Sequence, residues 1–232
     1  MNTILILDTE TTGLIEPIQP IEMAWLDISF PNLQVLDSFE RRYKPTKAIE
    51  YGAMATSHIL DSDLIDKHSY LEAIFDIPVD VEYIIGHNID YDWKVLNKPN
   101  IKRICTKALA QWLWPTLSSH SQSALLYFIY GEEARDWLKE AHSALCDIYN
   151  NKRLLQHILF TIDPDYKKNI TIEKLYELSE NARIPTIVSF GKFKGQPFTA
   201  MDSSYVNWWL NKSDNKPDEY QLKALRLAGF KV

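Results

Sequence analysis

The sequence predicts an α/β fold, in which helices flank a mixed β-sheet, followed by a small α+β module. Three observations lead to this expectation. Short β-prone runs come first, strands then alternate with helical segments, and helical patterns dominate up to about residue 160. The charge balance then changes, because residues 1–170 hold 16 basic and 24 acidic side chains, whereas residues 171–232 hold 9 and 7. Together with a polar, proline-containing stretch at 163–169, this change predicts domains at 1–165 and 171–232.

The predicted strands are short apolar runs between turn residues. Thr3–Leu7 is rich in isoleucine, as expected for a buried central strand. Ile21–Phe30 and Val35–Tyr43 flank a proline-containing turn and predict a hairpin. Later strands are expected at Tyr83–Gly86, Lys102–Cys105 and Val188–Phe190, the last leading into a Gly191–Gly195 turn.

Helical periodicity fills most of the remaining chain. Thr171 and Ser143 are residue types that favour N-cap positions at the start of two of these helices. Helices are expected over Asp90–Leu96, Thr106–Trp112, Gln122–Tyr130, Ser143–Phe160, Ile172–Arg183, Ser204–Leu210 and Asp218–Ala228.

The composition excludes several classes of protein. With 46% hydrophobic and 24% charged residues, the chain matches a folded globular protein and not a disordered one. A net charge of −6 argues against non-specific coating of nucleic acid, although it allows a local nucleic-acid site. Two cysteines suggest a reducing compartment, and no apolar run reaches membrane-spanning length. The first residues do not resemble a signal peptide, so we expect a cytoplasmic protein without membrane contact. The sequence indicates no oligomeric state.

Two carboxylates follow the first predicted strand. Asp8 and Glu10 are two residues apart, so on an extended chain both side chains point to the same side. Close carboxylates repel one another, and a divalent cation between their oxygens relieves that repulsion. Oxygen ligands favour Mg²⁺ or Mn²⁺ over zinc. An Asp-x-Glu pair is also common in solvated turns, and Asp80-Val81-Glu82 is a second example in this chain.

Two further acidic positions stand near helix starts. Asp92 lies near the start of a helix that follows a short strand. A lone carboxylate there often only complements the helix dipole, and Asp90 is a nearby competitor. Asp147 follows His142 by five residues, which corresponds to about 140° around one continuous helix. If Ser143 is the N-cap, however, His142 and Asp147 can face one pocket. The alternative is a helix-capping cluster with a surface histidine.

Taken together, the order and context of these motifs resemble those of the DnaQ-like 3′→5′ exonucleases, the DEDDh group, over about residues 1–160. The motifs are Asp8-x-Glu10-Thr11-Thr12-Gly13-Leu14, Gly86-His87-Asn88-x-x-Tyr91-Asp92 and His142-x-Ala144-x-x-Asp147. Shorter supporting matches are Ile21-Glu22-Met23-Ala24, Tyr43-x-Pro45, Ala55-Thr56-Ser57-His58-Ile59 and Cys105-Thr106. The tail, Val188–Pro197 followed by Tyr205–Leu210, is similar to the C-terminal module of exonuclease X-like proteins. One departure is His120-Ser121-Gln122, where relatives often carry a His-x-Leu pair.

The resemblance implies a ribonuclease H-like fold and a metal-dependent nuclease. Asp8, Glu10, Asp92 and Asp147 would hold two Mg²⁺ ions, with Mn²⁺ able to substitute. His142 would act as general base. The partner would be nucleic acid, most simply DNA 3′ ends, in repair or proofreading, and the product a nucleoside 5′-monophosphate.

Other residues are expected to contact the nucleic acid. By resemblance, Thr11, Gly13 and Leu14 would contact the terminal nucleotide, with Leu14 against a base, although Thr11–Gly13 also fits a plain turn. His87 and Asn88 would support the second motif, with Asn88 near the substrate. In the Gly191–Gly195 loop, Lys192 and Lys194 could contact phosphates and Phe193 could stack on a base. The alternative for this loop is a tight glycine turn with exposed lysines.

The sequence also allows three functions other than a DNA exonuclease. Two belong to the same class, an RNA 3′-end trimming exonuclease and a proofreading subunit of a polymerase. The third is a non-enzymatic nucleic-acid-binding protein on the same fold. A pure binder has no need for the four carboxylates and the histidine, so their joint presence favours an enzyme.

Overall fold

The chain forms two compact units in the computed structural model, which describes residues 3–139 and 142–232. The first unit extends to Ser179, and the second comprises Glu180–Val232. The division falls inside helix α8 (Ile172–Ala182), later than the 165–171 boundary expected from charge and composition. The reason lies in the first turns of α8, where Leu175 and Ser179 are fully buried and Ser179 accepts a hydrogen bond from the Cys105 N–H at 2.8 Å.

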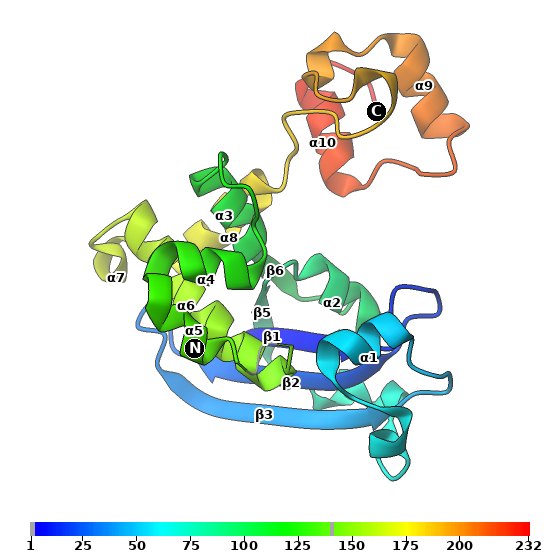
Figure 1. The fold of residues 1–232 in the computed structure, drawn as a ribbon. Coiled ribbons are helices and arrows are strands. Elements are labelled where there is room, and N and C mark those ends of the chain that lie inside the picture. Colours follow the sequence, from blue (N-terminus) through cyan, green and yellow to red (C-terminus); the bar gives the residue numbers. More distant parts are fainter. Residues whose placement is uncertain (1–2, 140–141) are drawn as a thin grey trace. The chain divides into compact units, whose positions relative to one another are not determined.

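The first unit is built on one mixed β-sheet (Figure 1). Its strand order is β4-β3-β2-β1-β5-β6. The β1–β2 and β2–β3 pairs are antiparallel, whereas β1–β5, β5–β6 and β3–β4 are parallel. The strands span Thr3–Thr11 (β1), Pro20–Ile28 (β2), Val35–Lys44 (β3), His68–Ser69 (β4), Val81–Gly86 (β5) and Lys102–Cys105 (β6). The predicted mixed sheet and its first hairpin are therefore confirmed, while the two-residue strand β4 was not expected.

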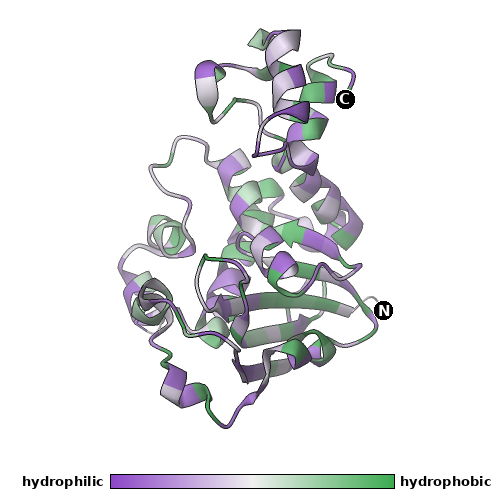
Figure 2. Cartoon of the chain, turned by 90° about the vertical axis from the view of Figure 1, so that its right-hand side faces the viewer, coloured by the Kyte–Doolittle hydropathy of each residue, from purple (hydrophilic) through white to green (hydrophobic). Residues whose placement is uncertain are grey.

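The sheet has its core at β1, the central strand. Leu5, Ile6 and Leu7 are fully buried, as the isoleucine-rich run predicted. Figure 2 shows hydrophobic colour along the strands of the sheet. Strand β1 continues four residues beyond the expected end, because it keeps pairing with β2 up to Thr11 opposite Pro20. This extension places the first acidic pair on the strand itself.

Helices cover the sheet and complete the first unit (Figure 1). Helix α6 packs against β1 and β2, and α3 and α4 pack against α6. Burial of Ile148, Leu155 and Ile158 on α6 supplies much of this contact. The helices span Tyr51–Ser57 (α1), Asp90–Val95 (α2), Thr106–Leu113 (α3), Gln122–Tyr130 (α4), Ala134–Trp137 (α5), Ala144–Ile162 (α6), Tyr166–Asn169 (α7) and Ile172–Ala182 (α8). The short helices α1, α5 and α7 were not expected, because each is held by tertiary contacts more than by its own pattern.

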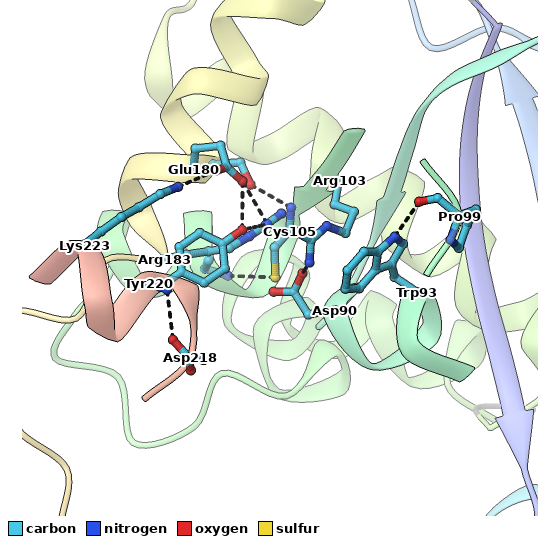
Figure 3. Close-up of polar contacts among 12 residues, drawn as sticks. Asp90, Trp93, Pro99, Arg103, Cys105, Glu180, Arg183, Asp218, Tyr220 and Lys223 are labelled. Carbon is cyan, nitrogen blue, oxygen red and sulfur yellow. Dashed lines mark hydrogen bonds and ion pairs between the residues drawn. The ribbon is translucent and has the colours of Figure 1, made fainter. Parts of the chain in front are cut away.

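The second unit has its own aromatic core. Trp209 is 1% exposed, packs edge-on against Phe190, and donates its indole N–H to the Asn215 carbonyl at 2.9 Å. Its helices are Ser203–Asn211 (α9) and Glu219–Leu227 (α10), close to the expected limits. Glu180 binds two residues of α10, accepting from the Tyr220 hydroxyl and the Lys223 ammonium at 2.8 Å each (Figure 3).

The predicted strand at Val188–Phe190 is wrong. The segment makes one isolated bridge between Ile187 and Pro197, and Gly191–Phe193 forms a 3₁₀ turn. A glycine is needed at the start of this turn, since φ is +63° at Gly191 and a Cβ would lie 2.0 Å from the Tyr205 hydroxyl. The chain thus turns back into the aromatic core before a ladder can form, and the β-structure of this unit is a single bridge.

In the described part of the chain, no helix is both long enough and apolar enough to cross a membrane.

Candidate active site

Three carboxylates meet at the end of β1. Asp8 and Glu10 lie on the same side of this strand, and Asp147 on the first turn of α6 joins them. One oxygen from each of the three lies within 4.8 Å of the other two. Strand periodicity brings the first two together, and the packing of α6 on β1 adds the third.

Asp92 lies next to this group and is almost fully buried, with 4% of the residue exposed. Its Oδ1 accepts two hydrogen bonds from Thr9, one from the backbone N–H at 3.0 Å and one from the hydroxyl at 2.7 Å. Thr9 stands between Asp8 and Glu10 on β1, so these bonds fix Asp92 beside the acidic pair.

The competing residue Asp90 has a different partner. Its carboxylate forms an ion pair with Arg103, whose guanidinium also stacks 3.9 Å above the Trp93 ring (Figure 3). Trp93 in turn donates its indole N–H to the Pro99 carbonyl at 2.7 Å. Asp90 therefore serves a cluster that holds α2 to the start of β6, which leaves Asp92 as the acidic residue of this helix at the site.

His142 precedes α6 as the N-cap argument required. The helix begins at Ala144 with Ser143 at the N-cap, although the Ser143 side chain makes no capping bond. His142 has φ of +73°, and its N–H donates to Asp147 Oδ2 at 3.2 Å. The residue is exposed and stands directly beside the carboxylate group. The same carboxylate accepts a second bond at 3.1 Å from the Gln122 amide, at the position of the noted departure.

The electrostatics of the site reflect the burial and the mutual repulsion of its carboxylates. Burial raises the pKa of Glu10 to about 8, with a further contribution from Asp147, and burial raises that of Asp92 to about 7. The pKa of Asp8 is raised well above its usual value by burial and by the charges of Asp92 and Asp147. Burial also raises the pKa of Asp147, although the charge of His142 opposes the shift. Like charges in a low-dielectric site resist simultaneous ionisation.

These residues suit a hard divalent cation. All the donors are carboxylate oxygens, which Mg²⁺ and Mn²⁺ prefer. Across residues 3–139 and 142–232, no lysine or arginine forms an ion pair with Asp8, Glu10, Asp92 or Asp147. The donor set fits the expected metal.

Glu22 is a site residue whose role the sequence did not indicate. Its residue is 1% exposed, its Oε1 accepts from Arg42 Nε at 2.8 Å, and its Oε2 accepts from the Ala144 N–H at 3.0 Å. It pairs with Glu10 across the β1–β2 ladder. Glu22 therefore anchors the first residue of α6 beside the carboxylates. The signals in the sequence were the Ile21-Glu22-Met23-Ala24 match and a charged residue within the apolar start of this strand.

His87 directly follows β5 and connects it to two other segments. Its Nδ1 lies 3.1 Å from the Thr106 hydroxyl, and its Nε2 lies 2.8 Å from the His120 carbonyl. Because burial lowers the pKa of His87 to about 4, the ring is neutral at physiological pH and donates from Nε2 to the carbonyl. Both bonds go to α3 and the loop before α4, so support of the second motif by His87 stays a prediction. Asn88 is exposed at the following turn with φ of +78°, and its carbonyl accepts from the Tyr91 N–H.

The loop after β1 carries the residues expected at the terminal nucleotide. Thr11 is buried, and its hydroxyl lies 2.8 Å from the Tyr91 hydroxyl and 3.2 Å from the Gly13 carbonyl. Gly13 has φ of +137°, and Leu14 is 79% exposed. The turn interpretation therefore holds for the backbone, while the side chain of Leu14 remains accessible to a ligand.

The glycine turn of the second unit differs from the expected finger. Phe193 is 8% exposed and packs edge-on against Tyr205, so the expectation that it stacks on a base is wrong. Lys192 is exposed, but its ammonium pairs with Asp202 at 2.8 Å. Lys194 is exposed as well. The structure thus favours the tight-turn alternative, with the lysines on its surface.

Comparison with known proteins agrees with this geometry. Residues 5–155 match the exonuclease family RNase_T. Exodeoxyribonuclease 10 of Escherichia coli is 26% identical over 220 residues, which cover 94% of each chain.

Solved structures show the same fold. Exonuclease X in complex with 5′-overhanging duplex DNA is 27% identical, with a TM-score of 0.60 over 76% of this chain and 99% of that one. The nuclease domain of 3′hExo, a DEDDh family member bound to rAMP, is 14% identical, with a TM-score of 0.53 over 68% of this chain and 92% of the other. The chain, with its ribonuclease H-like sheet and its carboxylate group, belongs to the RNase_T (DnaQ-like) exonuclease family.

Proposed function

We propose that this protein is a metal-dependent 3′→5′ exodeoxyribonuclease that releases nucleoside 5′-monophosphates from DNA ends. The observation that carries the proposal is the group formed by Asp8, Glu10 and Asp147, with Asp92 held beside it by Thr9. A buried carboxylate group without a neutralising cation is unfavourable, so a fold that builds one has a use for it.

Divalent cations are the ligands that these residues would hold. Asp8, Glu10 and Asp147 would share one, and Asp92 would complete the set for a second. The chemistry that such cations supply when bound is charge neutralisation at a phosphate and a lower pKa for an attacking water. Mg²⁺ is the expected ion, and Mn²⁺ is expected to substitute for it.

His142 is placed to accept a proton from that water. It precedes α6, and its backbone is tied to Asp147, so its imidazole stays near the carboxylates. Histidine is the side chain that most often serves as a general base in enzymes. The proposed leaving group is the 3′-oxygen of the preceding nucleotide.

DNA is the proposed substrate because of the relatives. Exodeoxyribonuclease 10, by its name, acts on DNA, and Exonuclease X was solved with duplex DNA. A role in DNA repair or proofreading would follow from this substrate. RNA is the main alternative substrate. A contact to the 2′-hydroxyl of the sugar is what would distinguish RNA from DNA.

The test compares the two Asp-x-Glu pairs of the chain. Asp8→Ala is expected to abolish Mg²⁺-dependent release of mononucleotides from 3′-labelled single-stranded DNA, whereas Asp80→Ala should retain it. Asp80 is the matched control, since within residues 3–139 and 142–232 its carboxylate accepts only from the Thr3 hydroxyl, at 2.8 Å. Undiminished cleavage by Asp8→Ala would falsify the metal assignment.

The same assay decides the substrate. Matched single-stranded DNA, duplex DNA and RNA are digested side by side with Mg²⁺, and the products are identified by chromatography. Faster cleavage of RNA than of either DNA would contradict the proposed substrate, and wild-type protein that binds nucleic acid without cleaving it would favour the non-enzymatic alternative.

A further inference from the structure

Two exposed aliphatic side chains follow β1 on a backbone that several hydrogen bonds hold in place. Leu14 is 79% exposed and Ile15 67% exposed. Before them, the Thr12 N–H donates to the Gln19 carbonyl at 2.9 Å, and the Thr12 carbonyl accepts from the Glu50 N–H at 2.8 Å. An exposed loop usually has a mobile backbone, so this combination of fixed backbone and free apolar side chains needs a cause.

Glu50 is the residue that fixes this loop. One carboxylate oxygen accepts from the Leu14 N–H at 3.1 Å, and the other accepts from the Ile15 N–H at 3.0 Å. Lys47 completes the contact, because its ammonium donates to the Ile15 carbonyl at 2.7 Å and lies 3.5 Å from the Glu50 carboxylate. The N–H of Ile15 lowers the pKa of Glu50, so the carboxylate remains charged. Charge-assisted bonds of this type are stronger than neutral ones.

The Glu50 carboxylate lies very close to the backbone of Gly13. A Cβ on Gly13 would lie 2.1 Å from Glu50 Cδ, and φ of +137° is a conformation that other residues rarely adopt. Lys47 and Glu50 together are called the clamp below. The clamp leaves no room for a side chain at position 13, and the loop has a glycine there.

The loop is also connected to the carboxylate site. The Tyr91 hydroxyl donates to the Gly13 carbonyl at 3.1 Å and contacts the Thr11 hydroxyl. Tyr91 directly precedes Asp92, and Thr11 directly follows Glu10. The loop that carries Leu14 and Ile15 is thus connected to two of the proposed metal ligands, to Glu10 through Thr11 and to Asp92 through Tyr91.

We propose that Lys47 and Glu50 are positioning residues that hold Leu14 and Ile15 as a rigid apolar edge for the 3′-terminal nucleobase. This inference rests on the proposed exonuclease function and adds the residues that orient its substrate. A nucleobase presents flat apolar faces, and a preordered edge binds it without the entropy cost of ordering a loop. Glu50 acts only through the loop and does not touch the reacting phosphate.

The experiment compares two oligonucleotides that differ at one nucleotide. Both are short single-stranded DNAs, and the 3′-terminal nucleotide of the second lacks its base. Glu50→Ala is expected to raise KM for the normal oligonucleotide about tenfold, the loss expected from one or two hydrogen bonds, with kcat changed less than about twofold. For the oligonucleotide without the terminal base, the variant should match the wild type.

Three variants serve as controls. Glu50→Gln retains one acceptor oxygen and should recover part of the loss. Glu16→Ala removes a carboxylate of the same loop that accepts from the Ile18 N–H and has no part in the contacts to Leu14 and Ile15, so it should leave KM unchanged. In the triple variant with Leu14→Ala and Ile15→Ala, Glu50→Ala should have no further effect, because contacts that act as a unit are not additive. Glu50 makes no side-chain cap on α1, so Glu50→Ala should also fold, and thermal unfolding checks this.

The outcomes separate this inference from the proposed function. An equal rise in KM for both oligonucleotides, or a loss confined to kcat, would overturn the positioning role while leaving the exonuclease intact. If the wild type does not cleave DNA, the proposed function fails. The clamp is then judged by fluorescence anisotropy in EDTA, where Glu50→Ala must weaken binding only of the oligonucleotide that has its terminal base.

Discussion

Hydrogen-bond and ion-pair partners decide which acidic residues belong to the site. Asp90 and Asp92 are two positions apart, yet Arg103 binds the first and Thr9 the second. Asp147 is held by the His142 N–H and by the Gln122 amide, so its orientation depends on a residue from another helix. At this scale, the partner of each carboxylate, and not its spacing in the chain, determines its role.

A substitution of His142 tests its role as a base. His142→Ala is expected to lower kcat about a hundredfold or more, the usual contribution of general base catalysis. Metal binding should be unchanged, because the backbone N–H that contacts Asp147 remains. Calorimetric titration with Mn²⁺ measures this, and a collapse of metal affinity would mean that His142 is a ligand.

At the scale of elements, the site depends on where one strand ends and where two helices begin. Strand β1 continues to Thr11, α2 starts directly after the turn at Asn88, and α6 starts at Ala144, where Glu22 on β2 accepts its first N–H. His87 connects the end of β5 to α3 and to the loop before α4. Because α4 carries Gln122, this connection reaches Asp147.

The buried His87 makes this region sensitive to acid. Its pKa is lowered from 6.5 to about 4 by burial, so below pH 6.5 the unfolded chain takes up a proton that the folded one does not. Above pH 6.5, protonation of this group takes nothing from the free energy of unfolding. As the pH falls from 6.5 towards 4, that free energy decreases by up to about 3 kcal/mol. His87→Gln should therefore show a smaller fall in Tm between pH 6.5 and 4 than the wild type. Parallel curves for the two proteins would contradict the assignment.

At the scale of the whole molecule, α8 determines where the chain can be divided. The second unit, residues 180–232, holds 8 basic and 5 acidic side chains, so it is the basic part of an acidic protein. Leu175 and Ser179 of α8 are buried in the first unit, although the charge pattern assigned the whole helix to the second domain. Lys194 and Lys192 remain proposed phosphate contacts on that unit.

Two truncations test this division. A chain ending at Ala182 keeps α8 and should fold with unchanged cleavage of a very short DNA, while its binding to long DNA weakens about tenfold at low salt. A chain ending at Ile170 loses α8 and should have a clearly lower Tm, because the packing of Leu175 is removed. Equal activity of the Ala182 truncation on long DNA would contradict a role for the second unit in binding.

The sequence by itself determined the mixed sheet, most of the long helices and the acidic motifs. The sheet and the helices follow from local periodicity, such as the buried Leu5–Leu7 run. The acidic motifs are recognised by the types and the spacing of their residues. The packing of α6 on β1, the Glu22 anchor, the Glu50 clamp and the burial of Phe193 were decided only by the tertiary structure. The physical reason is that each joins atoms far apart in the chain, and the energy of a buried charge or ring depends on neighbours that local sequence does not specify.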